Sequence, residues 1–150
     1  AWGGYYRGKQ GNAFFFDAGD GVNRGMPFAV FSLQGAKLLE DSHDGNGFSA
    51  VRVDPAGLVV QYRRVWAASC SLYADPAGCW KTIVAQTGLP ADARPDCRAA
   101  YEAEMARLPQ YAASTARSES VISYEAEARA TAQKTTFAAR PGPVRCWLPD

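Results

Sequence analysis

The chain has 150 residues, a length typical of a single domain that buries a substantial core without a metal or a partner. Its 16 lysines and arginines nearly balance its 15 aspartates and glutamates, and the resulting formal charge of +1 excludes the strongly basic surface typical of nucleic-acid binding. No stretch approaches the roughly 18 consecutive apolar residues of a membrane-spanning helix. We therefore expect one domain, residues 1–150, with no nucleic-acid partner and no membrane span.

Several short apolar segments near the start of the chain predict β-strands. Residues 1–11 interleave aromatic residues with glycines, which is typical of an edge strand or of an aromatic lid whose rings pack on the core. The runs at 14–16 and 27–33 have the composition of strands, and 36–40 either continues the second run or forms its own strand. The glycine-rich segment 17–25 is predicted to be a loop, and its glycines argue against a calcium site because they supply no side-chain oxygen.

Ser42, His43 and Asp44 are the side-chain types of a serine hydrolase, but they are adjacent in the chain. Catalytic triads are assembled from separated segments, because three consecutive residues do not align a nucleophile, a base and an orienting carboxylate. The Asp-Gly and Asn-Gly pairs within 41–47 predict a turn instead.

The strongest β signal lies in residues 48–70. Val51 and Val53 flank an arginine, and the run 58–66 is rich in β-branched and aromatic residues. Between them, Asp54-Pro-Ala-Gly57 favours a type I turn with a bulge, because proline presets φ, aspartate accepts from the turn amides and glycine tolerates positive φ. This segment therefore predicts a central hairpin.

Two later segments have the apolar spacing of α-helices. Asp75 is a suitable N-cap with Pro76 at the first helical position, which predicts a helix over 76–87. A second hairpin is the alternative, because the Asp-Pro-Ala-Gly of the first turn recurs here. The second helix is predicted to end at Pro109 and to pack on the sheet through an apolar stripe. The stripe consists of Cys97, Tyr101, Met105 and Leu108.

The last third of the chain returns to a β pattern. Residues 120–131 alternate in polarity over a long run, as in a strand with one buried face. We expect 134–139 to pair back onto this strand and 144–148 to form a short edge strand or an extended tail, since prolines precede it. The predicted fold class is α+β, an antiparallel β-sheet with a two-helix insertion packed on one face.

The four cysteines are an even set that predicts two disulfides in an exported protein. Reduced thiols and a metal site are the alternatives, although the absence of a C-x-x-C pair and the single His43 disfavour a metal. The predicted first helix is compatible with a Cys70–Cys79 bond, whereas a hairpin there is not. We expect Cys97, on the second helix, to bond to Cys146 in the C-terminal tail.

The beginning of the sequence lacks both a methionine and a signal peptide, which we interpret as the mature form of an exported protein. Abundant alanine, arginine, glycine and proline are typical of a GC-rich bacterium. The expected compartment is therefore the periplasm, which is oxidising.

Motifs for catalysis are missing from the sequence. Its glycine-rich stretches match neither phosphate-binding nor dinucleotide-binding loops, and one histidine leaves no multi-histidine metal site. We expect a protein that is not an enzyme and that carries no cofactor and no metal. A hydrolase that uses only aspartate and glutamate, such as a glycosidase, and an envelope structural or binding domain are the alternatives.

The size, the four cysteines and the β-rich chain with a helical pair resemble a class of periplasmic immunity proteins. Bacteria with type VI secretion systems use these proteins against their own peptidoglycan-degrading amidase effectors. The resemblance extends over the whole chain and assigns no single residue. It implies a protein partner, the amidase, whose active site is occluded by a protruding loop. We expect the contact at 110–119 or at 41–47. The candidate residues are Tyr111, Ser114 and Ser118 in the first loop and Ser42, His43 and Asp44 in the second.

Overall fold

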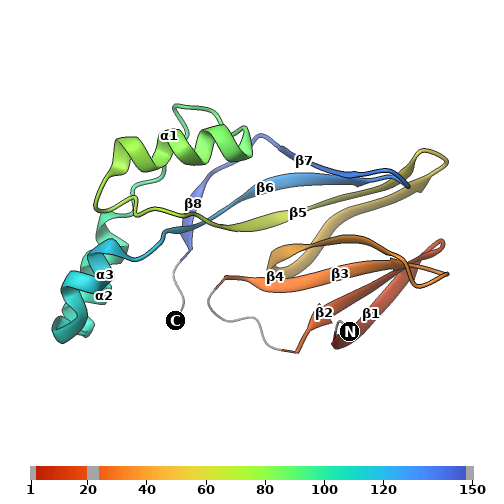
Figure 1. The fold of residues 1–150 in the computed structure, drawn as a ribbon, viewed down its shortest axis with the longest axis horizontal. Helices are drawn as coiled ribbons and strands as arrows, with labels where there is room; N and C mark the ends of the chain where they lie inside the picture. The colour runs from red at the N-terminus through yellow and green to blue at the C-terminus, as the bar shows by residue number, and fades with distance from the viewer. Residues whose placement is uncertain (1–2, 20–23, 148–150) are drawn as a thin grey trace.

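The structure, a computed structural model, describes residues 3–19 and 24–147. Eight strands form one antiparallel sheet, in which β1 to β7 are neighbours in chain order and β8 pairs with β6 (Figure 1). The elements are β1 (Gly4–Gln10), β2 (Ala13–Ala18), β3 (Met26–Ser32), β4 (Lys37–Asp54), β5 (Gly57–Ala67), α1 (Pro76–Thr87), α2 (Arg98–Arg107), the 3-10 helix η1 (Pro109–Tyr111), α3 (Ala112–Arg117), β6 (Val121–Ala130), β7 (Thr135–Ala139) and β8 (Arg145–Trp147). The predicted α+β class with an antiparallel sheet is confirmed.

The long strand β4 folds the sheet into two layers. Its first part pairs with β3 and its second part with β5, and the register shifts between His43 and Phe48. In Figure 1, β4 passes from the lower layer, which contains β1 to β3, to the upper layer, which contains β5 to β7. Thr135 Oγ1 also donates a hydrogen bond of 2.8 Å to Leu38 O, which links β7 to the start of β4. One face of each layer is therefore turned towards the same interior.

The turn predicted over 41–47 is wrong, because these residues lie inside β4. Gly45 (φ 93°) and Gly47 (φ 74°) do adopt the left-handed conformation that their turn-like neighbours suggest. They form an irregularity within the strand instead of ending it, because His43 pairs with β3 on one side and with β5 on the other.

Two apolar clusters cover the inner face of the sheet. One lies between the two strand layers, and the other lies between the sheet and the helices. Strand β6 contributes to both through the alternate residues that its sequence pattern marks as buried. These residues are Ile122, Tyr124 and Ala126 in the helix-covered cluster, and Ala128 and Ala130 in the cluster between the layers. The predicted strand and its buried face are confirmed.

Strand β1 is an edge strand of the sheet, one of the two alternatives predicted for residues 1–11. Its aromatic side chains do not pack in the core, because Tyr5 and Tyr6 are 63% and 56% exposed. Trp2 and residues 20–23 of the predicted 17–25 loop lie outside the described residues.

The pairing of β1 with β2 is irregular at its centre. The register shifts between Tyr6 and Gly8, which places a bulge in the edge strand. Arg7 beside this bulge forms an ion pair of 2.9 Å with Asp17 on β2, and Lys9 follows two residues later. The edge is therefore interrupted by a bulge and carries two cationic side chains, one of them paired with Asp17.

The predicted central hairpin is confirmed as β4 and β5. Asp54 Oδ1 accepts hydrogen bonds from the backbone N–H groups of Ala56 (3.0 Å) and Gly57 (3.1 Å). Gly57 has a φ of 143°, which favours glycine at the end of the turn.

The first predicted helix is confirmed as α1, with the predicted bounds. The Asp75 side chain accepts a hydrogen bond of 3.1 Å from Gly78 N, so it caps the helix as expected. Cys79, Trp80 and Ile83 on this helix are buried against the sheet.

The insertion contains three α-helices instead of the two expected. The predicted second helix is confirmed as α2, but the segment 110–119, predicted to be a loop, is mostly helical. Pro109 ends α2 and then occupies the first position of η1, where the N–H that proline lacks is not needed. The proline that ends α2 is therefore also the first residue of η1.

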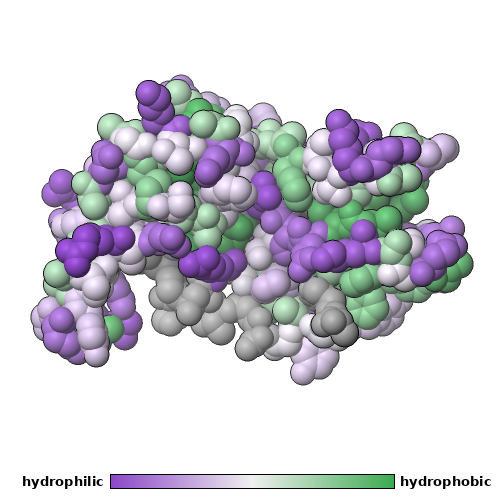
Figure 2. Space-filling view, viewed as in Figure 1, coloured by the Kyte–Doolittle hydropathy of each residue, from purple (hydrophilic) through white to green (hydrophobic). Residues whose placement is uncertain are grey.

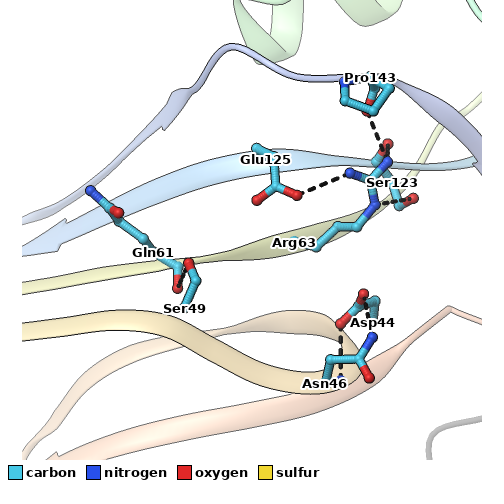
Figure 3. Close-up of polar contacts among 8 residues, drawn as sticks. All are labelled: Asp44, Asn46, Ser49, Gln61, Arg63, Ser123, Glu125 and Pro143. Atoms are coloured by element: carbon cyan, nitrogen blue, oxygen red, sulfur yellow. Dashed lines mark hydrogen bonds and ion pairs between the residues drawn. The ribbon is translucent and has the colours of Figure 1, made fainter.

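Strands β7 and β8 both pair with the same edge of β6, and Arg63 holds the segment between them. Its guanidinium donates hydrogen bonds to Pro143 O (2.8 Å), Ser123 O (3.1 Å) and Ser123 Oγ (3.0 Å), and it pairs with Glu125 at 3.1 Å. Figure 3 shows this side chain extending from β5 across β6. One partly buried cation therefore fixes the path of residues 140–144.

Candidate functional site

The four cysteines form two disulfides, Cys70–Cys79 and Cys97–Cys146, with Cα–Cα distances of 5.5 and 5.6 Å. This is the pairing preferred from the sequence, and it is confirmed. The first bond joins the segment after β5 to α1, and the second joins the start of α2 to β8. Two disulfides fit an exported protein, because such bonds persist in oxidising compartments.

Helices α2 and α3, with η1 between them, form a helical hairpin, residues 98–117, that extends beyond the end of the sheet (Figure 1). Tyr101 is the buried residue of α2, and α3 buries none. In the space-filling view the helical hairpin forms a knob at the lower left with a mostly hydrophilic or neutral surface (Figure 2). A segment with so little core contact presents most of its surface to solvent.

The helical hairpin is attached at its base by a few directional contacts. Tyr101 Oη donates a hydrogen bond of 2.9 Å to Ser118 O and lies 2.7 Å from Ser120 Oγ, and its ring stacks on Tyr73 with centroids 5.3 Å apart. Ser71 Oγ donates to the carbonyl oxygen of Ala116 at 2.8 Å. Together with the Cys97–Cys146 bond, these contacts fix a mainly exposed element at one end.

A pocket of about 500 Å³ lies beside this base and is shared by the helical hairpin, β8 and the start of β6. Its lining includes two of the predicted contact residues, Ser114 and Ser118. Tyr101, Trp147 and the Cys97–Cys146 disulfide contribute apolar surface. The volume is in the range of small-ligand and side-chain pockets.

The other predicted contact residues lie outside this pocket. Tyr111 is 57% exposed where the two helices of the hairpin meet. Ser42 and Asp44 are partly exposed on β4, where Asp44 accepts hydrogen bonds of 2.9 Å from the backbone and side-chain nitrogens of Asn46 (Figure 3). The structure therefore separates the two predicted loops into two distinct surfaces.

His43 is not a surface residue, since its side chain is only 1% exposed. Its Nε2 lies 3.0 Å from Asp17 Oδ1, and its Nδ1 accepts a hydrogen bond of 2.9 Å from Gly45 N. Because Nδ1 accepts, the hydrogen-bond network assigns the ring proton to Nε2, which donates to Asp17. The expectation of a partner contact at His43 is corrected, and neither ring nitrogen is available as a general base.

Replacing His43 with alanine is expected to lower the free energy of unfolding by about 2 kcal/mol, because a buried cavity forms and Gly45 N loses its acceptor. Urea denaturation followed by circular dichroism measures this change. Asp44→Asn, at the neighbouring partly exposed position, is the control, with an expected change of about 0.5 kcal/mol or less. An equally small effect of the His43 change would contradict the buried role.

A second polar group lies on the inner face where the two apolar clusters meet. Arg64 Nε lies 2.7 Å from Asp41 Oδ2, and Arg64 Nη1 donates a hydrogen bond of 3.2 Å to Tyr124 Oη. The Tyr62 hydroxyl donates to Asp41 Oδ2. The Arg64 guanidinium also lies against the Phe137 ring, 4.0 Å from its centroid. Tyr62 belongs to the cluster between the layers and Tyr124 to the helix-covered one, so Arg64 joins the two.

Burial and charge act in opposite directions in this group. Burial raises the pKa of the Asp41 carboxyl, although Arg64 opposes the shift. Burial disfavours the charge of Arg64, but Asp41 and the two tyrosines together outweigh this effect and raise its pKa. The pKa of Tyr62 is raised, first by burial and then by Asp41. Arg64 therefore stays protonated as the counter-ion of a carboxyl that is poorly solvated.

No protein-family model, curated protein or solved structure matches the chain. Within residues 3–19 and 24–147, no three histidine, cysteine, aspartate or glutamate side chains gather into a group able to hold a metal ion. The helices in the same part of the chain are all too short or too polar to cross a membrane. Function is therefore inferred from the exposed helical hairpin and its pocket.

Proposed function

We propose that the protein is an exported binding protein that acts through its helical hairpin, and more specifically a periplasmic immunity protein that occludes the active site of a peptidoglycan amidase effector. The observation that carries the proposal is the helical hairpin itself. It projects from the sheet, its α3 has no buried residue, and a disulfide fixes its base. The specific partner class follows the resemblance in size, cysteine number and secondary structure.

A preformed projection suits the inhibition of an enzyme groove. Less conformational entropy is lost on binding when the inserted segment is already ordered, and the Cys97–Cys146 bond and the Tyr101 hydrogen bonds order this one. Tyr111 at the turn of the helical hairpin is an exposed aromatic side chain of the kind that anchors interfaces. Occlusion needs no chemistry from the inhibitor, which is consistent with the engaged nitrogens of His43.

The proposal is tested by capturing partners from the periplasm of a bacterium with a type VI secretion system, followed by amidase assays with the captured protein. We expect a peptidoglycan amidase whose activity falls to zero at a one-to-one ratio. Capture of a glycan or small ligand without a protein, or turnover of a peptidoglycan or glycan substrate by the chain alone, would instead support the alternative of an Asp/Glu hydrolase or an envelope binding domain.

Tyr111→Ala is expected to raise the dissociation constant of that complex about thirtyfold, because a central aromatic anchor contributes about 2 kcal/mol or more. The loss should appear mainly as faster dissociation in surface plasmon resonance. Tyr5→Ala is the matched control, since Tyr5 is also exposed (63%) but lies on β1. A larger effect of the Tyr5 change would move the contact away from the helical hairpin.

A further inference from the structure

We propose that the Cys97–Cys146 bond is a site of thiol–disulfide exchange, at which a dithiol attacks Cys146 and releases the helical hairpin. The exchange itself is independent of the proposed function, whereas its effect on partner binding rests on that function. The support comes from the cavities beside the bond, the unequal burial of its two cysteines, the position of Cys97 at the start of α2, and the weak attachment of the joined elements.

Two cavities border this bond. Cys97 and Cys146 both line the pocket of about 500 Å³ beside the helical hairpin. Cys97 also lines a second pocket, of about 390 Å³, which is shared by the starts of α1 and α2. Neither Cys70 nor Cys79 lines either pocket. These cavities give a small thiol room beside the Cys97–Cys146 bond, and thiol–disulfide exchange depends on such access.

The two cysteines of the bond differ in burial, and this difference determines which sulfur is attacked. Cys97 is 4% exposed, whereas Cys146 is partly exposed on β8, a strand of only 3 residues. An incoming thiolate therefore attacks Cys146 Sγ, and Cys97 is the leaving group.

Cys97 lies where a departing thiolate is stabilised. It is the N-cap residue of α2, a helix of 10 residues, and its side chain makes no capping hydrogen bond. A thiolate at this position accepts from backbone N–H groups of the first turn, and the positive end of the helix dipole favours its charge. A more stable thiolate leaves faster.

A free cation also lies near Cys97. Arg94 and Arg98 line the second pocket together with one carboxylate, that of Asp96. Arg98 is paired with Glu102 at 3.6 Å, and Asp96 Oδ1 accepts a hydrogen bond of 3.0 Å from Arg98 N. Arg94 forms no ion pair or side-chain hydrogen bond within the described part of the chain. Its guanidinium is therefore available to a Cys97 thiolate.

The Cys70–Cys79 bond lacks this arrangement. Cys79 is 2% exposed and also lies near the start of a helix, α1. The carboxylate of Asp75 already caps α1 by accepting a hydrogen bond of 3.1 Å from Gly78 N. Its negative charge disfavours a second anion in the same region.

The exchange is a balanced two-electron step. A thiolate of the dithiol forms a bond to Cys146 Sγ, while the Cys97–Cys146 bond breaks and its electron pair passes to Cys97 Sγ. The second thiol of the reductant loses its proton and closes a ring on the first sulfur, which releases Cys146 as a thiolate. The dithiol is thereby oxidised to a cyclic disulfide, and the two cysteines take up two electrons and two protons.

Opening the bond frees elements that have few other attachments. Tyr101 is the buried residue of α2, and α3 buries none. The hydrogen bonds from Tyr101 to Ser118 O and from Ser71 to Ala116 O remain, but they are solitary contacts at the base of the helical hairpin. We therefore expect the helical hairpin to lose its fixed orientation while the sheet stays folded.

The test is a brief exposure of the full chain to dithiothreitol, followed by alkylation and peptide mass spectrometry. We expect Cys97 and Cys146 to be alkylated at least about tenfold faster than Cys70 and Cys79. With the monothiol 2-mercaptoethanol we expect the adduct on Cys146 and the alkyl group on Cys97. Equal rates for the two bonds, faster opening of Cys70–Cys79, or an adduct on Cys97 would overturn the inference.

A pair of variants tests the leaving group. Arg94→Gln is expected to slow the opening of the bond about threefold, because the Cys97 thiolate loses a nearby cation. Lys81→Gln on α1 is the matched control, since Lys81 is exposed and lines neither pocket. Equal rates for the two variants would contradict the role given to Cys97.

Amide hydrogen exchange after selective opening measures the release of the helical hairpin. We expect faster exchange over residues 98–117 and unchanged exchange in β4 and β5, whereas faster exchange throughout the chain would contradict a local release. The opened chain is expected to bind a captured amidase at least about tenfold more weakly. Selective opening without a captured amidase would reject only the proposed function. Amidase capture by a chain in which both bonds open equally fast would reject only the exchange site.

Discussion

Replacing Arg64 with methionine is expected to lower the free energy of unfolding by about 3–5 kcal/mol, because the change leaves Asp41 buried without its counter-ion. Arg64 is 8% exposed, and its guanidinium contacts Asp41, Tyr124 and Phe137. Methionine retains much of the volume, so the predicted loss is mainly electrostatic. Urea denaturation monitored by tryptophan fluorescence measures the change.

The double variant Asp41→Asn with Arg64→Met provides the internal test. Removing both charges should recover at least about half of the single-variant loss, since an uncompensated buried charge is less favourable than a neutral pair. Arg52→Met is the surface control, because Arg52 is 61% exposed and is paired with Asp54 at 3.4 Å. We expect a change of less than about 0.5 kcal/mol there. A double variant as unstable as the sum of its two single variants would rule out the coupling.

Removing the Cys97–Cys146 disulfide by paired serine substitutions is expected to lower the free energy of unfolding by about 4 kcal/mol, against about 2.5 kcal/mol for Cys70–Cys79. The difference follows from the length of chain that each bond closes, a sequence separation of 49 for the first and of 9 for the second. A longer closed loop restricts the unfolded chain more. Thermal or urea denaturation of the two variants compares them directly.

The two variants also differ in where they should act. Loss of the Cys97–Cys146 bond should speed amide hydrogen exchange in the helical hairpin, because α2 is then attached mainly through Tyr101. Loss of the Cys70–Cys79 bond should speed exchange near α1 instead. Equal losses of stability together with the same exchange pattern would show that neither bond acts through its own loop.

The parts of the fold that the sequence predicted are those determined by local patterns. The alternation along β6 and the Asp75-Pro76 start of α1 are each contained in a few consecutive residues. The central turn at Asp54 is equally local. The disulfide pairing followed from these elements, since the helix at 76–87 brings Cys79 back towards Cys70.

The features that sequence reasoning missed depend on distant partners. Gly45 and Gly47 give a turn signal, but the pairing of His43 with two other strands keeps this segment in β4. Nothing local in the sequence marks Arg64 as a buried residue. It stands next to another arginine, and its partner Asp41 is 23 residues away in the chain. The alternation of β5, in which Arg64 shares a face with Tyr62, was the one available indication that it points inward.

The bulged edge strand β1, with its two cationic side chains, has a consequence for how the protein behaves at high concentration. An exposed edge is a template to which further strands can add, and this is a common route to aggregation. In β1 the bulge between Tyr6 and Gly8 interrupts the row of backbone groups, and a second copy added to this edge would bring its own Arg7 and Lys9 close to these cations. The opposite edge strand β7 has only 5 residues. Both ends of the sheet are thus poor templates for the addition of further strands, and we expect the protein to resist edge-to-edge polymerisation at high concentration.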